Sequence, residues 1–238
     1  EMSKCAEKIT VVCRQLVESK WKYPDNVTLC YTTEQVDVFD VEKRPLRKKI
    51  GYFLRFVHEI RKKVFFEKLD LVVVYDAIPL FAYSLATIGL PKSKKPKLWY
   101  HNHDKADISR CKKFSVSWFA AKQESKLFEK TDFFSLPSNE RKKYFPLNSY
   151  KGNYFFIPNY PLKSFFASFD IKNRTKSDKI RLLYQGTIGP NHGFEEIIEC
   201  MKHTVSGKTI TLSLVGKIRP HYKKFLDELA IEDRKSTR

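Results

Sequence analysis

Glycine is scarce in this chain of 238 residues, and five of its eight glycines lie after residue 185. Because glycine permits sharp turns and close approach of the backbone to a ligand, candidate binding turns concentrate in that part of the chain. The spacing there fits neither the dinucleotide-binding G-x-G-x-x-G pattern nor the P-loop pattern G-x-x-x-x-G-K-[ST]. Both of these phosphate-binding motifs are therefore excluded.

Disulfide frameworks, zinc sites and membrane spans find equally little support. The five cysteines are odd in number, scattered and without a C-x-x-C pair, which favours reduced thiols in a cytosolic compartment. The apolar run at 71–90 has the length of a membrane span, but Asp76 and Pro79 interrupt it. We therefore divide this run into a buried strand at 71–75 and a buried helix at 80–88.

Acidic residues are outnumbered, with 27 Asp and Glu against 45 Lys and Arg, and the formal net charge is +18. Such a charge attracts anions, among them nucleic acids, acidic lipid surfaces and phosphorylated ligands. The composition fits equally well a protein from a lysine-rich, AT-biased genome. Because no nucleic-acid recognition motif accompanies the charge, we expect no nucleic-acid partner.

Hydrophobic periodicity predicts alternating strands and helices over residues 1–162. The helix predicted at 46–68 keeps apolar residues at three- and four-residue spacing. These apolar residues are Leu46, Ile50, Phe53, Leu54, Val57, Ile60 and Val64. Strands are expected at 9–13, 27–31, 71–75, 97–101, 132–136 and 154–157, and further helices at 118–130 and 139–144, the last capped by Ser138.

Two strand–glycine-turn–helix units follow in tandem. The first has a strand at 179–185, a turn at 186–193 and a helix from 194, and the second has a strand at 209–215, a turn at 216–220 and a helix at 221–230. Such turns present free amides and the positive end of a helix dipole to an anion, which predicts a phosphate site. The alternative is a pair of ordinary turns that need glycine only for their geometry.

This alternation predicts an α/β protein with two Rossmann-like, doubly wound parallel-sheet domains, the second of them incomplete. We expect an N-terminal domain at 1–162, a linker at 163–178 and the start of a C-terminal domain at 179–238. In such sheets ligands bind at the carboxyl ends of the strands, so a crevice between the domains is the expected site.

Six segments, in order, resemble the motifs of the GT-B glycosyltransferases, specifically glycosyltransferase family 4. They are DLVVVYD at 70–76, YHNHD at 100–104, DFFSLPS at 132–138, FIPN at 156–159, LYQG at 183–186 with HG at 192–193, and LVG at 214–216. The resemblance covers nearly the whole chain. It implies a GT-B fold, with the N-terminal domain on the acceptor side and the C-terminal domain holding the nucleotide-sugar.

The resemblance also implies an activity: retaining, metal-independent transfer of a sugar from a nucleotide-sugar donor to a saccharide or lipid-linked acceptor, in surface polysaccharide synthesis. No cofactor is implied. The expected location is the cytoplasm, peripheral on the inner membrane face, where an anionic membrane surface is a further expected partner. The alternative is a non-catalytic GT-B-like binding subunit.

Among single residues, His103 is the candidate catalytic residue, because by resemblance it contacts the donor sugar near the reacting carbon; the alternative is a histidine that merely caps its strand. His101, two residues earlier, is expected to be structural, and no third ligand accompanies the pair to make a metal site. The predicted donor-binding residues are Gly186, Thr187, Gly189, His192, Gly193, Gly216 and Lys217.

The chain also departs from the family pattern. The family's Arg and Lys that grip the donor diphosphate are here Thr187 and His192, so loop amides and the helix start would carry more of the binding. The Glu-x7-Glu segment and the glycine-rich acceptor loop have no counterpart. We therefore expect an internal piece of a longer enzyme, inactive by itself.

Overall fold

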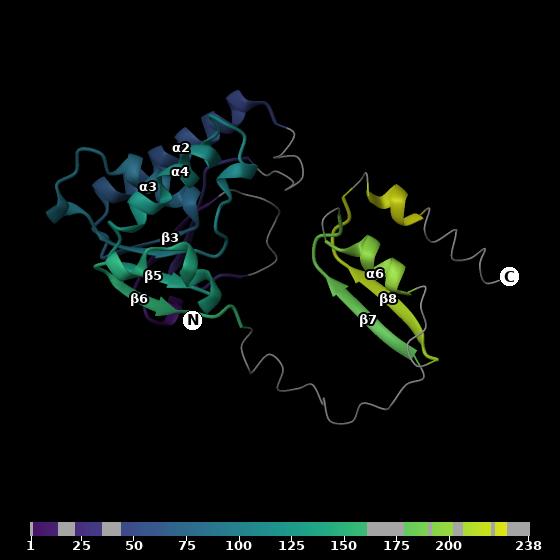
Figure 1. The fold of residues 1–238 in the computed structure, drawn as a ribbon. Helices are drawn as coiled ribbons and strands as arrows, with labels where there is room; N and C mark the ends of the chain where they lie inside the picture. The colour runs from purple at the N-terminus through teal and green to yellow at the C-terminus, as the bar shows by residue number, and fades with distance from the viewer. Residues whose placement is uncertain are drawn as a thin grey trace. The chain divides into compact units, whose positions relative to one another are not determined.

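The computed structural model describes residues 2–13, 22–34, 44–160, 179–189, 192–201, 207–219 and 222–227. Contacts divide the chain into two compact units, Glu1–Pro161 and Leu162–Arg238, and Figure 1 shows the elements of each. The linker predicted at 163–178 lies outside the described residues.

Unit 1 is built on a four-stranded parallel sheet. Its strands are β3 (Leu71–Tyr75), β4 (Lys97–His101), β5 (Phe133–Leu136) and β6 (Asn153–Phe156), in the order β3-β4-β5-β6. A separate parallel pair joins β1 (Ile9–Cys13) to β2 (Val27–Tyr31). The predicted α/β class with parallel strands is therefore confirmed.

Three helices, α2 (Leu46–Phe66), α3 (Ala77–Ala86) and α4 (Val116–Phe128), pack over one face of this sheet (Figure 1). The core lies between the helices and the sheet, where the helix residues Ile60, Leu80 and Phe128 cluster with the strand residues Tyr100 and Phe134. Tyr100 and Phe134 are neighbours on adjacent strands, so one face of the sheet supplies both of these core residues. The connections contain 3-10 turns at Met2–Lys4, Lys92–Lys94, Ile108–Arg110, Asn139–Tyr144 and Leu147–Ser149.

Helix α2 differs from its prediction in what it buries. Leu46, Ile50 and Leu54 were expected on the core side, yet they are 50%, 40% and 58% exposed. The later residues of the predicted stripe, Ile60 and Val64, are buried, and Phe53 and Val57 pack against the same core. Leu46 and Val64 are about five turns apart and lie on the same face, so the spacing identified the face that meets the core but not which turns of the helix reach it.

Helix starts also differ from prediction. Helix α3 begins at Ala77 and includes Pro79, because proline is tolerated in a first helical turn, where its missing N–H costs no hydrogen bond. Ser138 does precede a short helix, but its side chain makes no capping hydrogen bond, because its hydroxyl donates to the Glu140 carboxylate.

Unit 2 contains a parallel pair, β7 (Lys179–Gln185) and β8 (Thr209–Val215), with α6 (Phe194–Met201) and a helical segment at 222–227. A single bridge between Ile188 and Ile218 continues the ladder beyond the strands. Its small core is formed by Ile188, Phe194 and Tyr222. Across the described parts of both units, no helix combines the length and apolarity needed to cross a membrane.

Candidate functional site

The carboxyl edge of the four-stranded sheet gathers polar side chains from three adjacent strands. Strand register pairs Tyr75 with His101 and His101 with Ser135, and Asp76 and His103 follow just beyond the strand ends. Parallel strands end at one edge, so residues that are far apart in sequence become neighbours there.

Asp76 organises this edge, although sequence reasoning gave it no role. Its backbone has φ 63° and ψ 175°, a region that residues other than glycine occupy at a cost of about 1–3 kcal/mol. Its Oδ1 accepts hydrogen bonds from the amides of His103, at 2.7 Å, and Asp104, at 2.9 Å. The strained turn thus fixes the backbone at the candidate catalytic histidine.

His101 is hydrogen-bonded to a buried serine. Its Nδ1 lies 2.7 Å from Ser135 Oγ, and Trp99 Nε1 donates to the same oxygen at 2.8 Å. The indole N–H is the donor to Ser135, and the hydroxyl still has its own proton and a second lone pair, so it can pair with either tautomer of His101. Burial, and then the neighbouring His103, lower the pKa of His101, while Asp76 opposes the shift.

The Ser135–His101 contact does not make a nucleophile pair. Ser135 is fully buried, and its oxygen already accepts a hydrogen bond from Trp99. An attacking hydroxyl must reach a substrate, and this one is shielded. The expectation that His101 is structural agrees with this geometry.

His103 lies just beyond β4 with its backbone fixed from two sides. Its amide donates to Asp76, and its carbonyl accepts from Arg141 Nη1. The ring is partly exposed, with its centroid 6.2 Å from that of His101. Within the described residues no hydrogen bond holds this ring, so its nitrogens remain available to a ligand.

A buried polar network lies behind this edge. Glu124 of α4 has no exposed surface and accepts hydrogen bonds from the Tyr100 hydroxyl at 2.5 Å and Asn102 Nδ2 at 3.1 Å. Lys105 Nζ pairs with its other oxygen at 2.5 Å. Burial and the Glu124 carboxylate raise the pKa of Tyr100, so this phenol remains a donor. The network ties α4 to the segment that carries both histidines.

Metal ligation finds no geometric support in the described parts of the chain, where no three His, Cys, Asp or Glu side chains are placed to share an ion.

In unit 2 the two predicted glycine turns lie directly against each other. Gly186 N donates to Val215 O at 3.0 Å, and Ile188 N donates to Lys217 O at 2.9 Å. A Cβ atom added at Gly216 would lie 1.8 Å from Gly186 O. Close approach of the turns thus explains both glycines by geometry, and the Gly186 amide is already used within the protein.

Of the other predicted residues of the first turn, Thr187 and His192 are exposed, Gly193 is half-buried and Gly189 is buried. Tyr184 donates its hydroxyl hydrogen to Thr187 O at 2.9 Å and lies 3.2 Å from His192 Nδ1, so His192 donates to Tyr184. The Thr187 and His192 side chains therefore flank one turn. Gly193 has φ 72°, and its carbonyl accepts from Ile197 N at the start of α6. The bend at 190–191 lies outside the described residues.

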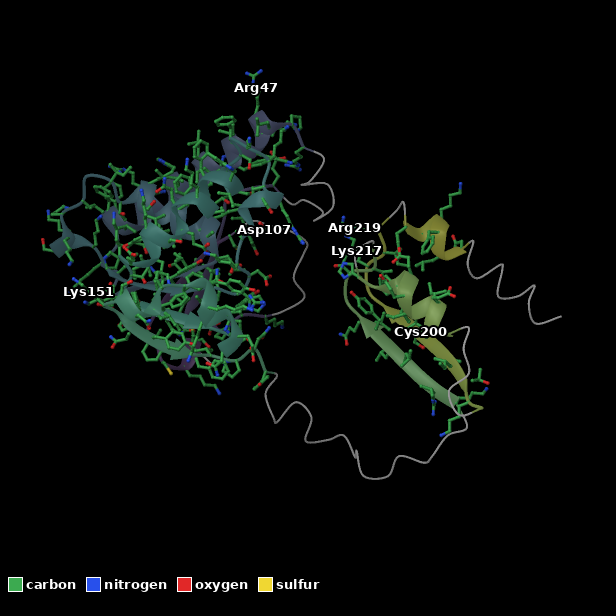
Figure 2. All side chains as sticks on the ribbon, viewed as in Figure 1. Arg47, Asp107, Lys151, Cys200, Lys217 and Arg219 are labelled. Atoms are coloured by element: carbon green, nitrogen blue, oxygen red, sulfur yellow. The ribbon has the colours of Figure 1, made fainter. Side chains whose placement is uncertain are left out.

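Lys217 and Arg219 extend from the second turn at the same end of unit 2 (Figure 2). Arg219 N donates to Ile188 O at 3.0 Å, which places this arginine beside the first turn. Sequence reasoning included Lys217 but missed Arg219, because only the pairing of the two turns brings residue 219 close to Gly189. The sequence Gly207-Lys208-Thr209 leads into strand β8 and not into a helix, so it is no P-loop.

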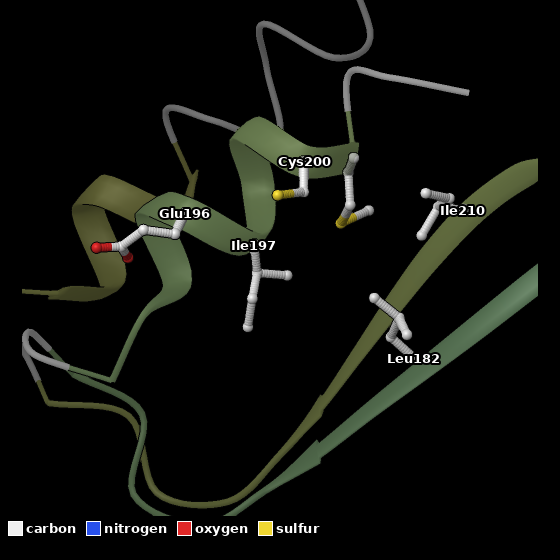
Figure 3. Close-up of a pocket in the computed structure, with 6 residues that line it drawn as sticks. Leu182, Glu196, Ile197, Cys200 and Ile210 are labelled. Atoms are coloured by element: carbon white, nitrogen blue, oxygen red, sulfur yellow. The ribbon is translucent and has the colours of Figure 1, made fainter. Parts of the chain in front are cut away.

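A pocket of about 190 Å³ lies elsewhere in unit 2, between α6 and the strands (Figure 3). Its lining is almost wholly apolar and contains none of the predicted site residues. The lining residues are Leu182, Glu196, Ile197, Cys200, Met201 and Ile210. Nothing in it suits a phosphate, so it does not mark the candidate site.

Comparison with known proteins leaves the family open: no protein-family model matches the chain, and no curated protein matches it.

Proposed function

We propose that this chain belongs to a GT-B glycosyltransferase of the family 4 type, which transfers a sugar from a nucleotide-sugar to a saccharide or lipid-linked acceptor. The observation that carries the proposal is the pair of interlocked parallel βα turns in unit 2. These turns present Thr187, His192 and Lys217 together at the carboxyl ends of β7 and β8. That edge of a parallel sheet is where α/β proteins bind phosphorylated ligands.

The proposed chemistry is retention at the anomeric carbon, with a nucleoside diphosphate as leaving group. Negative charge develops on the diphosphate as the bond to the sugar breaks. Preorganised donors and cations aimed at such charge are usually the largest catalytic contribution. The turns of unit 2 would serve this role.

Calorimetry with matched ligands tests the proposal. UDP and GDP are each titrated into the intact chain beside uridine and guanosine, which lack the diphosphate. We expect one of the diphosphates to bind at least about tenfold more tightly than its nucleoside, as charge-assisted hydrogen bonds to phosphate require. Equal affinity for diphosphate and nucleoside would refute a diphosphate site.

A non-catalytic binding subunit is the second candidate, favoured by the uncharged Thr187 and by His192 bonded to Tyr184. Such a subunit would bind a nucleotide-sugar without cleaving it. Chromatography of a bound nucleotide-sugar after long incubation separates the two candidates. Transfer of the sugar to water or to an added saccharide, with an equal amount of nucleoside diphosphate released, refutes the binding subunit, whereas recovery of intact ligand at full occupancy refutes transfer by this chain alone.

An anionic membrane surface is the proposed location of the acceptor reaction. On α2 the exposed side chains of Ile50 and Leu54 lie among the exposed Arg47, Lys48 and Arg55. Apolar side chains flanked by cations suit the interface of an acidic bilayer, where each basic residue contributes about 1 kcal/mol. Cosedimentation with phosphatidylglycerol vesicles that does not exceed that with phosphatidylcholine vesicles would remove this part of the proposal.

A further inference from the structure

Arg219 lies across the glycine turn of the first βα unit. A Cβ atom added at Gly189 would be 2.9 Å from Arg219 Cδ and 3.3 Å from its Nε. The arginine side chain therefore occupies the space that any larger residue at 189 would fill. Its position depends on the glycine, which is a packing reason for Gly189 beyond backbone geometry.

The backbone of Arg219 is fixed from both sides. Its amide donates to Ile188 O at 3.0 Å, and its carbonyl accepts from Tyr222 N at 2.8 Å and Lys223 N at 3.2 Å. Ile188 and Tyr222 belong to the small core of unit 2. A cation on a rigid backbone loses little conformational freedom on binding, so it is well suited to hold an anion.

The charges around the turns show why a cation is needed. Glu195 and Glu196 occupy the first turn of α6, where their carboxylates already interact with the positive end of the helix dipole. Tyr222 donates its hydroxyl hydrogen to Glu195 at 2.8 Å. Neither Thr187 nor His192 offers a permanent positive charge. A diphosphate bound here would therefore lie near two carboxylates, and the turn between β7 and α6 would supply no permanent cation.

We infer that Arg219 supplies the permanent positive charge for the donor diphosphate, replacing the basic pair absent from the first turn. The inference rests on the proposed function and identifies the residue on which its binding step depends. Guanidinium binds phosphate oxygens in bidentate fashion, which an ammonium cannot do. Arg219 would therefore fix the orientation of the diphosphate as well as its affinity.

The test compares two arginines of unit 2 in the intact chain. Arg219→Gln removes the proposed contact, and Arg181→Gln removes an exposed arginine from strand β7, with the same change in net charge. Inorganic pyrophosphate and UDP are titrated into each protein. We expect Arg219→Gln to weaken both ligands by about tenfold or more, the loss of a charged hydrogen bond, and Arg181→Gln to weaken them by less than about twofold.

If the wild-type protein binds both ligands and the two substitutions weaken their binding equally, the role of Arg219 is overturned while the proposed function stays intact. Absence of binding to wild type would overturn both. If Arg219→Gln fails to fold, the NMR signal of the Arg219 Nε–H group in the wild-type protein tests the contact. This signal is assigned by its absence from the spectrum of Arg219→Lys. A shift of that signal with pyrophosphate supports the contact, and an unchanged signal while the amides of Thr187 and Gly189 shift contradicts it.

Discussion

Glu124 shows how one buried carboxylate can hold a candidate site together. It is fully buried, and its carboxylate accepts hydrogen bonds from Tyr100, Asn102 and Lys105, which alternate along the chain with or follow His101 and His103. In Glu124→Gln an amide would face the Lys105 ammonium, so the ion pair is lost and a buried donor is left unmatched. We expect unfolding free energy to fall by about 2 kcal/mol.

Urea unfolding followed by tryptophan fluorescence measures this loss, because all three tryptophans lie before residue 162. Glu129→Gln, at an exposed position just after the same helix, is the matched control and should change stability by less than about 0.5 kcal/mol. Equal losses in the two variants would show that the network contributes nothing.

His101 gives the protein a predicted sensitivity to acid. Its pKa in the folded state lies below the ordinary value of 6.5, so the unfolded chain takes up its proton first as pH falls. Stability should therefore decline as pH drops from 6.5 toward the folded pKa. His101→Gln, which keeps a hydrogen-bonding partner for Ser135 but cannot titrate, should lose less stability between about pH 7.5 and about pH 5.5. A decline equal to that of wild type would contradict this assignment.

The turn between β3 and α3 combines a strained backbone with a useful carboxylate. Asp76→Ala keeps the unfavourable φ of 63° and loses both amide hydrogen bonds, whereas Asp76→Gly loses the bonds but relieves the strain. We expect Asp76→Gly to be more stable than Asp76→Ala by about 1 kcal/mol, and both to be less stable than wild type. If the urea midpoint of Asp76→Ala equals or exceeds that of Asp76→Gly, backbone strain at this turn is excluded.

The paired turns of unit 2 make a sharper glycine prediction. Gly207 and Gly216 both have positive φ, but only Gly216 faces a backbone atom, Gly186 O, where a Cβ would lie. Gly207→Ala should cost about 1 kcal/mol for its φ alone, whereas Gly216→Ala should cost about 3 kcal/mol or more. The Gly186 and Ile188 amides donate hydrogen bonds across the two turns, so their hydrogen-exchange protection reports the stability loss in each variant. Equal protection in the two variants would refute the close approach.

Strands were predicted better than helix burial and turns, for physical reasons. The short apolar run at 71–75 and the segment at 97–101 form β3 and β4 with the predicted bounds. In helix α2 the spacing identified the buried face, but it did not show that Leu46 and Ile50 in the first turns lie beyond the core. The φ of Asp76 depends on hydrogen bonds to residues 27 and 28 positions away, which no local pattern encodes.

At the scale of the whole molecule, the candidate site was predictable only in part. Local motifs identified His103 and the glycine turns, because each stands at the end of a recognisable strand. Asp76, Ser135 and Arg219 were missed, since their significance arises from strand pairing that brings together residues distant in sequence. The net charge of +18 indicates attraction to anions but does not select one.

The turns of unit 2 are the place where the account can be tested most directly. Titration of isotope-labelled protein with UDP and GDP, followed by amide NMR signals, reports binding and its location together. The account predicts that one of these ligands shifts the signals of Thr187, Gly189, His192, Lys217 and Arg219 in a saturable way. Signals that stay unchanged at those positions, or shifts confined to unit 1, would contradict the assignment of a nucleoside diphosphate to these turns.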